Sequence, residues 1–90
     1  DLSSDEAIVD GQILQLTRRE LRVLSALMKR RGRVLLRESL EQAVYRFDDY
    51  VQSNTLDSHI SRLRRKLADA NAGIEIHSIL GVGYFLRAEI

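Results

Sequence analysis

The 90-residue chain has no cysteine and no proline, and neither sign of charge dominates, because its formal net charge is +1. Without cysteine, a disulfide framework and a thiolate metal site are excluded, and a reducing compartment is favoured. No apolar run approaches the about 20 residues that span a bilayer, and no signal-peptide pattern is present, so we expect no membrane partner. A chain of this length buries a single core, which argues against a multistep enzyme and predicts one domain over residues 1–90.

Charge is nevertheless unevenly distributed along the chain. Residues 1–16 hold four acids and no base, residues 18–37 hold eight bases against Glu20 alone, and residues 38–57 are again mostly acidic. Such blocks predict one positive face, and the local field rather than the net charge attracts a polyanion.

The most informative segment is 53–67, SNTLDSHISRLRRKL, which we predict to be one amphipathic helix extending to about 69. A period of about 3.6 residues places four aliphatic residues on one stripe that faces a core: Leu56, Ile60, Leu63 and Leu67. The opposite side is polar, with Asn54, Ser58 and Arg65 at its centre, Ser61 and Arg62 beside them, and Thr55, His59, Arg64 and Lys66 at its borders. This pattern suits the major groove of DNA. Taken alone, it also fits a solvated basic face.

Two elements precede this helix. Strands within about 2–16 are predicted to form a hairpin around Asp10-Gly11, a dipeptide that favours a two-residue turn. A helix is predicted over about 18–30, because Thr17 and Glu20 have the spacing of a capping box. Its apolar residues would be Leu21, Leu24, Leu27 and Met28, and Arg18, Arg19 and Arg22 would point outward.

A second helix is predicted over about 36–45, with Leu36, Leu40 and Val44 on its apolar side, followed by a loop over 46–52. Ser53 or Asn54 would cap the next helix. A second hairpin is predicted over about 74–88, with Gly81 and Gly83 bracketing its turn. The order predicts an α+β winged helix-turn-helix with three helices, a short N-terminal hairpin or sheet, and a C-terminal hairpin wing.

Several ordered motifs carry a family resemblance from Asp10 to Leu86. They are Leu16-Thr17-x-x-Glu20, Gly32-x-Val34 followed by Arg37-x-x-Leu40, the run from Asn54 to Leu67, and Ile79-x-Gly81-Val82-Gly83-Tyr84-x-Leu86. On these motifs the chain resembles the DNA-binding effector domain of OmpR/PhoB-type response regulators of bacterial two-component systems.

The resemblance implies sequence-specific binding of double-stranded DNA, with helix 53–67 in the major groove and the wing near a minor groove. It assigns base reading to Thr55, Ser58 and Arg62, to which the helical pattern adds Asn54, Ser61 and Arg65. It assigns phosphate contacts to Arg37, Tyr45 and the flanking residues His59, Arg64 and Lys66, and the wing to Leu80, Gly81, Val82, Gly83 and Tyr84.

The resemblance further implies head-to-tail homodimers on direct repeats, an upstream receiver domain phosphorylated through a sensor histidine kinase, contact of loop 46–52 with RNA polymerase, and a bacterial cytoplasmic location. Two features depart from the family. Leu80 occupies a wing position that is often Arg in the family. Its side chain carries no charge, so it cannot provide the cationic contact that an Arg makes in the minor groove. The N-terminal segment is short for the usual four-stranded sheet.

Several of these residues have a structural interpretation as well. His59 could form a local hydrogen bond, Tyr45 could border the core, Arg64 could pair with an acid of the second helix, and Gly81 and Gly83 could serve the turn alone. His59 and His77 lie on different elements, so we expect no metal site, and Asp48 and Asp49 lack a nearby base or nucleophile. We expect no cofactor and no enzyme activity. The alternative to a DNA reader is a winged-helix module that binds protein.

Overall fold

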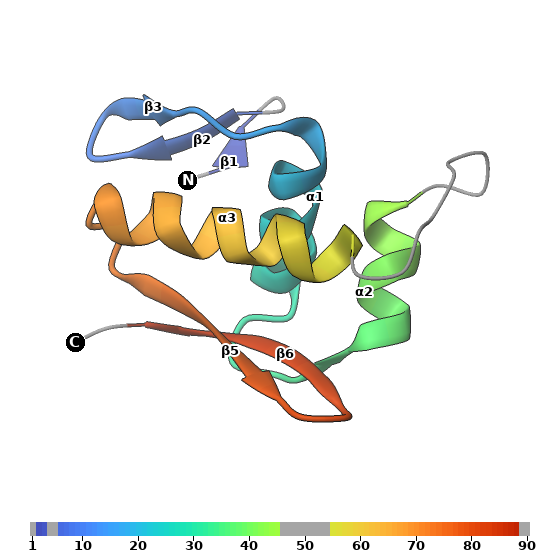
Figure 1. Cartoon of the computed structure of the whole chain (residues 1–90). Coiled ribbons are helices and arrows are strands. Elements are labelled where there is room, and N and C mark those ends of the chain that lie inside the picture. Colours follow the sequence, from blue (N-terminus) through green and yellow to red (C-terminus); the bar gives the residue numbers. More distant parts are fainter. Residues whose placement is uncertain (1, 4–5, 46–54, 89–90) are drawn as a thin grey trace.

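The computed structural model describes residues 2–3, 6–45 and 55–88, and in them three helices pack with two small antiparallel sheets (Figure 1). The predicted α+β class and winged helix-turn-helix order are confirmed. The predicted cap at Ser53 or Asn54 and the loop 46–52 lie outside the described residues. The elements are β1 (Leu2–Ser3), β2 (Glu6–Val9), β3 (Gln12–Leu14), α1 (Arg18–Lys29), β4 (Leu35–Leu36), α2 (Arg37–Val44), α3 (Thr55–Asp69), β5 (Ile74–Ile79) and β6 (Gly83–Ala88).

The N-terminal sheet has the order β1-β2-β3. The predicted hairpin is present: Val9 pairs with Gln12 across a turn in which Asp10 and Gly11 have φ of 50° and 80°. Two successive left-handed residues match the right-handed twist of a two-residue hairpin. Strand β1 extends this hairpin to three strands within the described residues, where the resemblance predicts four.

Helix α1 begins where the capping box predicts. Thr17 Oγ1 accepts a hydrogen bond from the Glu20 amide (3.1 Å), and Glu20 Oε1 accepts one from the Thr17 amide (3.0 Å). The outward orientation predicted for Arg22 is wrong, because its guanidinium donates to the Val44 carbonyl oxygen (2.9 Å) and thereby ties α1 to the end of α2. Val23, which the predicted apolar face omitted, is fully buried.

The segment before α2 forms strand β4, which the sequence did not predict. β4 pairs with β6 through Leu35 opposite Tyr84 and Leu36 opposite Gly83. Leu36 was expected on the apolar side of the second helix, and this is wrong: it ends β4, precedes the first turn of α2, and is 55% exposed. Leu40 is fully buried as predicted.

The C-terminal sheet has the order β4-β6-β5, so the wing is the β5–β6 hairpin with β4 along its other edge. Gly81, with φ of 74°, lies in the turn as predicted. Gly83 lies instead in β6, where a Cβ atom would stand 2.1 Å from the Leu35 carbonyl oxygen. Gly83 is therefore needed for the close approach of β4 rather than for the turn.

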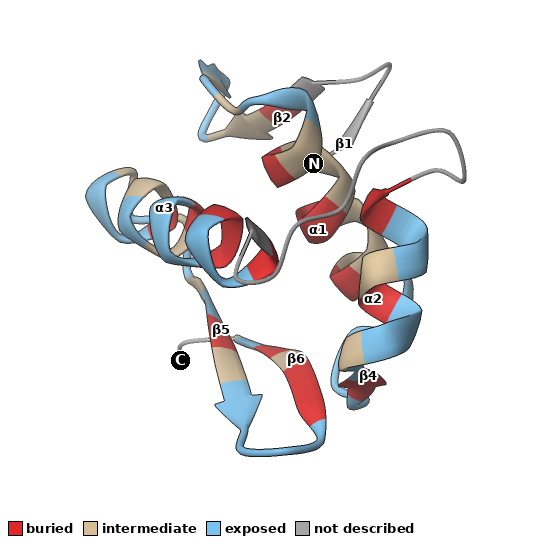
Figure 2. Cartoon of the chain, turned by 45° about the vertical axis from the view of Figure 1, so that its right-hand side comes forward, coloured by how far each residue is buried: buried red, intermediate tan, exposed pale blue. Residues whose placement is uncertain are grey.

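The core lies between the three helices and the inner sides of the two sheets, and buried positions face inward on each helix (Figure 2). The predicted stripe of α3 is confirmed, since its four aliphatic residues are at most 3% exposed. Among the described helices, none combines the length and apolar character that crossing a lipid bilayer requires. The buried cluster consists of Ala7, Val23, Leu24, Leu27, Leu35, Leu40, Val44, Tyr45, Leu56, Ile60, Leu63, Leu67, Ile76, Tyr84 and Leu86.

Candidate nucleic-acid interface

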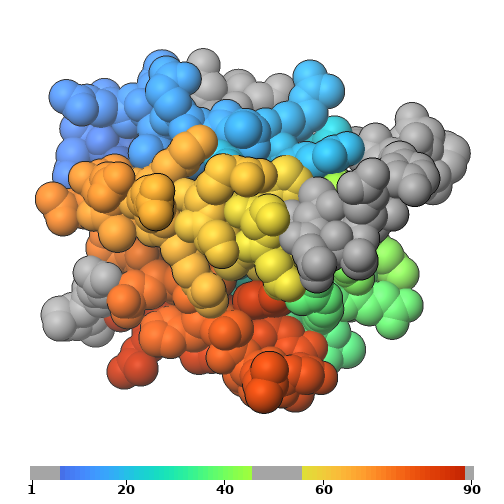
Figure 3. All heavy atoms as spheres, in the orientation of Figure 1, coloured from blue at the N-terminus to red at the C-terminus, as the bar shows by residue number. Residues whose placement is uncertain are grey.

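Helix α3 crosses one face of the molecule, with the N-terminal segment on one side and the β5–β6 wing on the other (Figure 3). Four of the predicted base-reading residues are exposed on its outer side: Ser58, Ser61, Arg62 and Arg65. Thr55 is the first residue of α3, and Asn54 lies outside the described residues. α3 carries no acid from Ser58 to Ala68, so this exposed side is suited to an anionic partner.

One side of α3 is held by a buried carboxylate on α1. The Glu20 side chain has no exposed surface, and Lys66 Nζ lies 2.6 Å from its Oε1, while Arg62 Nε lies 3.4 Å from its Oε2. Burial alone would raise the pKa of Glu20, but hydrogen bonds from Lys66 and the Thr17 amide outweigh it and lower this pKa. Lys66, predicted as a phosphate ligand, therefore already has an anionic partner, and Arg62 is oriented by the same carboxylate.

His59 joins this cluster from the interior. Its Nδ1 lies 3.1 Å from Arg62 Nη2, and its side chain is largely buried. Burial, then the charges of Arg62 and Arg19, lower the pKa of His59, which favours the neutral ring. Within the described part of the chain, His59 Nε2 has no hydrogen-bond partner. His59 thus lies beneath the outer side of α3 that carries Ser58, Ser61, Arg62 and Arg65, hereafter the reading face, and little of its ring is exposed.

Tyr45 lies at the edge of the core, as its structural interpretation predicted. It is 5% exposed, its ring centroid is 6.1 Å from that of His59, and the Arg19 guanidinium lies 4.9 Å from the ring centroid. A cation over the face of a tyrosine is attracted by the ring quadrupole. Arg19 on α1 therefore packs against the residue that ends α2, a contact that the sequence did not predict.

A second network joins α2, α3 and the wing. Arg37 donates to both carboxylate oxygens of Asp57, at 2.8 and 3.3 Å, and to the Tyr84 hydroxyl at 2.9 Å. Tyr84 in turn donates to Asp57 Oδ1 at 2.6 Å. The hydrogen bond to Asp57 raises the pKa of Arg37, and those from Arg37 and Tyr84 lower the pKa of Asp57. Burial, followed by the bond to Asp57, raises the pKa of Tyr84.

Arg64 anchors α3 to the wing. Its Nε donates to the Ile76 carbonyl oxygen at 2.9 Å. The predicted alternative, an ion pair with an acid of the second helix, is therefore wrong. The long side chain of Arg64 instead crosses from α3 to β5.

The tip of the wing is apolar. Leu80 is fully exposed, Val82 is 43% exposed, and Ile79 and Leu36 lie beside them in paired strands. Leu80, Gly81 and Val82 form the turn, which the Val82 amide closes by donating to the Ile79 carbonyl oxygen at 2.9 Å. Gly83 and Tyr84, also assigned to the wing, are buried in β6. The tip consequently offers no cation of its own.

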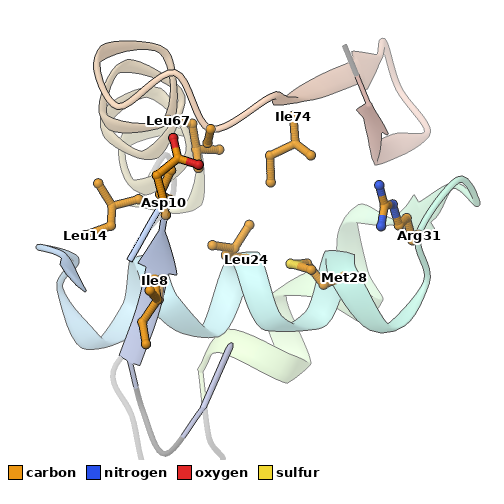
Figure 4. A pocket seen from close by; sticks show the side chains of 11 residues that line it. Ile8, Asp10, Leu14, Leu24, Met28, Arg31, Leu67 and Ile74 are labelled. Carbon is orange, nitrogen blue, oxygen red and sulfur yellow. The ribbon is translucent and has the colours of Figure 1, made fainter. Parts of the chain in front are cut away.

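A pocket of about 260 Å³ lies between the N-terminal sheet, α1 and the start of β5 (Figure 4). Its lining is mostly aliphatic and includes Leu24, Met28 and Ile74, with Asp10 and Arg31 as its charged residues. Leu67, at the end of the buried stripe of α3, also lines it, so the pocket lies behind the reading face.

The second histidine is separate from the first. His77 lies on β5, stacks on Phe85 with ring centroids 5.3 Å apart, and approaches Glu75 Oε1 at 3.4 Å. Among the described residues there is no group of three or more His, Asp or Glu side chains that could hold a metal ion.

Two acids contact the predicted DNA-binding cations and are absent from the predicted site: Glu20 and Asp57. The capping box predicts the bond of Glu20 to Thr17 but not its ion pairs with α3, and the motif that contains Asp57 does not predict its contact with Arg37. The signal for both was in the sequence, because a lone acid among eight bases and a lone acid in the first turn of a basic helix each have nearby cations as partners.

The pair of helices α2 and α3, with the outer side of α3 exposed, and the adjoining β5–β6 hairpin define a winged helix-turn-helix, a class of DNA-binding domain that docks its recognition helix in the major groove. The family described as "Transcriptional regulatory protein, C terminal" matches residues 11–86. The chain belongs to this family, and it is a DNA-binding effector domain of the OmpR/PhoB type.

Individual relatives and solved structures are consistent with this family assignment. The chain is 42% identical over 79 residues to the probable transcriptional regulatory protein y4xI of Sinorhizobium fredii, covering 88% of this chain and 35% of that protein. It thus spans about a third of the length of this relative. Among solved structures, it resembles the response regulator DrrB of Thermotoga maritima, an OmpR/PhoB homolog (TM-score 0.74, 28% identity, 92% of this chain and 38% of the other). It also resembles the AdeR DNA-binding domain, solved in complex with an intercistronic region (TM-score 0.73, 26% identity, 99% and 98%).

Proposed function

We propose that α3 reads a specific base sequence in the major groove of double-stranded DNA. The observation that carries this proposal is the exposed side of α3, which presents Ser58, Ser61, Arg62 and Arg65 with no acid between Ser58 and Ala68. Serine hydroxyls and guanidinium groups match base-edge acceptors, and Arg forms the commonest specific contact, a bidentate bond to guanine. Thr55 and Asn54 would extend this reading surface at the start of the helix.

The contact between Glu20 and Arg62 supports a division of work within this surface. A base contact needs a side chain whose direction is fixed, and Arg62 is oriented from α1 while remaining 55% exposed. Arg65 is exposed on the same helix and has no ion pair among the described residues. We therefore assign Arg62 to base reading first, with Arg65 reading an adjacent base or phosphate. A phosphate role for the other predicted residues requires that each side chain release its present partner or share it with the phosphate. These residues are Arg37, Arg64, Lys66, Tyr45 and His59.

The whole protein of which this domain is a part would be a regulator with an upstream receiver domain, phosphorylated by a sensor histidine kinase, in the bacterial cytoplasm. This proposal draws on the family and on longer relatives, of which the chain covers about a third. Head-to-tail pairing on direct repeats and contact of loop 46–52 with RNA polymerase belong to the same proposal. We assign the domain a binding role and not a catalytic one.

Selection of bound sequences from a random duplex library tests the proposal. The winning duplex and a scrambled one are then compared at several salt concentrations. Enrichment of a tandem repeat, with a preference that survives added salt, is expected, because phosphate contacts weaken with salt while base contacts maintain the difference between sequences.

A second function is favoured by the apolar wing tip, since Leu36, Ile79, Leu80 and Val82 are exposed together. Such a patch is typical of a surface that binds protein. Equal binding of all duplexes, abolished by moderate salt, would support this protein-interaction module and exclude the specific reader.

A further inference from the structure

We propose that Asp57 is a specificity-determining residue that holds Arg37 away from DNA phosphates and thereby suppresses sequence-independent binding. This inference rests on the proposed function, because it concerns how the reading face distinguishes one duplex from another. Asp57 is an anion in the first turn of α3, on a surface that is proposed to bind the anionic backbone of DNA.

Geometry shows how fully Asp57 occupies Arg37. Nη1 and Nη2 of Arg37 approach the two carboxylate oxygens at 2.8 and 3.3 Å, a forked arrangement that fixes both side chains. A phosphate would use the same two nitrogens. The carboxylate therefore competes directly with DNA for this guanidinium.

The competition takes place at the surface. The side chains of Arg37 and Asp57 are 41% and 52% exposed, so a phosphate can reach the pair from solvent. Glu41 Oε2 lies 3.9 Å from Arg37 Nε and adds a weaker anionic contact. Arg37 is consequently a cation whose charge is already balanced before any duplex arrives.

The Tyr84 hydroxyl makes the arrangement more than a simple surface pair. It donates to Asp57 at 2.6 Å and accepts from Arg37 at 2.9 Å, while its ring is buried in β6. Exposed ion pairs are weak when both partners move freely. Here a buried tyrosine holds the carboxylate in place, so the restraint on Arg37 is built into the packing of the wing.

The restraint on Arg37 should affect sequence-specific and sequence-independent complexes with DNA differently. A complex fixed by base contacts keeps α2, α3 and β6 in place, so Arg37 remains paired. A sequence-independent complex has no fixed register and depends almost entirely on phosphate contacts, so one more free cation raises its affinity. Asp57 therefore penalises the second kind of complex most.

The test measures the affinity of the domain for a random duplex and for its selected duplex over a range of salt concentrations. For Asp57→Asn we expect the log–log salt slope on the random duplex to steepen by about 0.9. With equal affinities at 1 M salt, this slope gives about eightfold tighter binding at 0.1 M salt, and the preference for the selected duplex should fall several-fold. Asp57→Ser, which retains a hydroxyl acceptor, should behave in the same way and provides a second variant if the first unfolds.

Two controls isolate the effect of Arg37. Asp69→Asn changes the net charge equally at the far end of α3 and should change the slope much less. Arg37→Ala combined with Asp57→Asn should remove the gain, because the released cation is gone. A slope that is unchanged in Asp57→Asn, matched by Asp69→Asn, or still steepened in the double variant would overturn the inference.

These outcomes differ from failure of the proposed function. A wild-type domain that binds selected and random duplexes equally would overturn sequence-specific reading. The slope difference between Asp57→Asn and wild type on random duplex would still report whether Asp57 restrains Arg37.

Discussion

Lys66 Nζ on α3 lies 2.6 Å from Oε1 of Glu20, a carboxylate of α1 with no exposed surface. The same oxygen accepts a hydrogen bond from the amide of Thr17, the residue that caps α1. One side chain thus begins the first helix and fixes the third, so its loss should alter both.

Glu20→Gln is expected to destabilise the domain by about 1 to 3 kcal/mol, because it removes the charge that strengthens the hydrogen bond from Lys66 while retaining much of the shape. Urea unfolding at pH 7 measures this. Glu75→Gln is the control, since Glu75 is an exposed acid on β5 and its substitution should stay within about 0.5 kcal/mol. Equal effects of the two variants would contradict a special role for Glu20.

The contribution of Glu20 should depend on acid pH. Its folded-state pKa lies below its ordinary value of 4.5, so the unfolded state binds a proton first as pH falls. The stabilisation is therefore complete above about pH 5 and is lost as pH drops through the folded-state pKa. Asp57, whose pKa is also lowered, acts with the same sign. The difference in unfolding free energy between wild type and Glu20→Gln should shrink from pH 6 to pH 3, and a constant difference would refute this account.

Gly83→Ala should destabilise the domain more than Gly81→Ala does. A Cβ atom at Gly83 would lie 2.1 Å from the Leu35 carbonyl oxygen, so β4 or β6 must move, at a cost of about 1 to 3 kcal/mol or more. At Gly81 the space is open, and only the left-handed φ of 74° is strained, at about 1 to 2 kcal/mol. Thermal melting of both variants gives the order, and the reverse order would show that β4 yields easily.

Arg62→Ala should weaken binding to the selected duplex by about 1 to 3 kcal/mol and relax one base position, as expected for a bidentate base contact. Arg65→Ala is the matched change on the same side of α3, because Arg65 does not contact Glu20 as Arg62 and Lys66 do. A competition assay with all four bases at each position separates the two. Equal losses on selected and random duplex for Arg62→Ala would assign Arg62 to phosphate instead.

Leu80→Arg should raise duplex affinity and steepen the salt slope by about 0.9 if the wing tip lies against DNA, because it adds one cation at a fully exposed position. Ile13→Arg is the control on β3, where an apolar residue is 55% exposed on the N-terminal sheet. The same slope for both variants would mean that the tip does not approach the backbone.

The sequence predicted those elements whose pattern repeats over many residues. The apolar stripe from Leu56 to Leu67 spans three turns, and the Thr17–Glu20 capping box has a fixed spacing, so both were correctly located. Strand β4 has only two residues, too few to show the alternation of a strand. The pattern therefore placed Leu36 in the predicted helix 36–45. Leu36 pairs with Gly83, a residue 47 positions away.

The reading face was predicted in outline for the same reason, since a helical period separates inner from outer positions. The partners of Arg37, Arg64 and Lys66 were not predicted, because Asp57, the Ile76 carbonyl and Glu20 reach them only once the helices and wing are packed. A count of cations thus overstates how many are available to phosphate.

Within the described residues, Arg62 on the outer side of α3 is held by Glu20 of α1 and by the buried His59. Ser61 and Arg65, by contrast, are exposed residues outside the buried stripe. An engineer who wished to retarget the domain to a new operator would therefore randomise positions 61 and 65 at little risk to folding. A change at position 62 would have to be chosen together with position 20, because the two side chains form an ion pair.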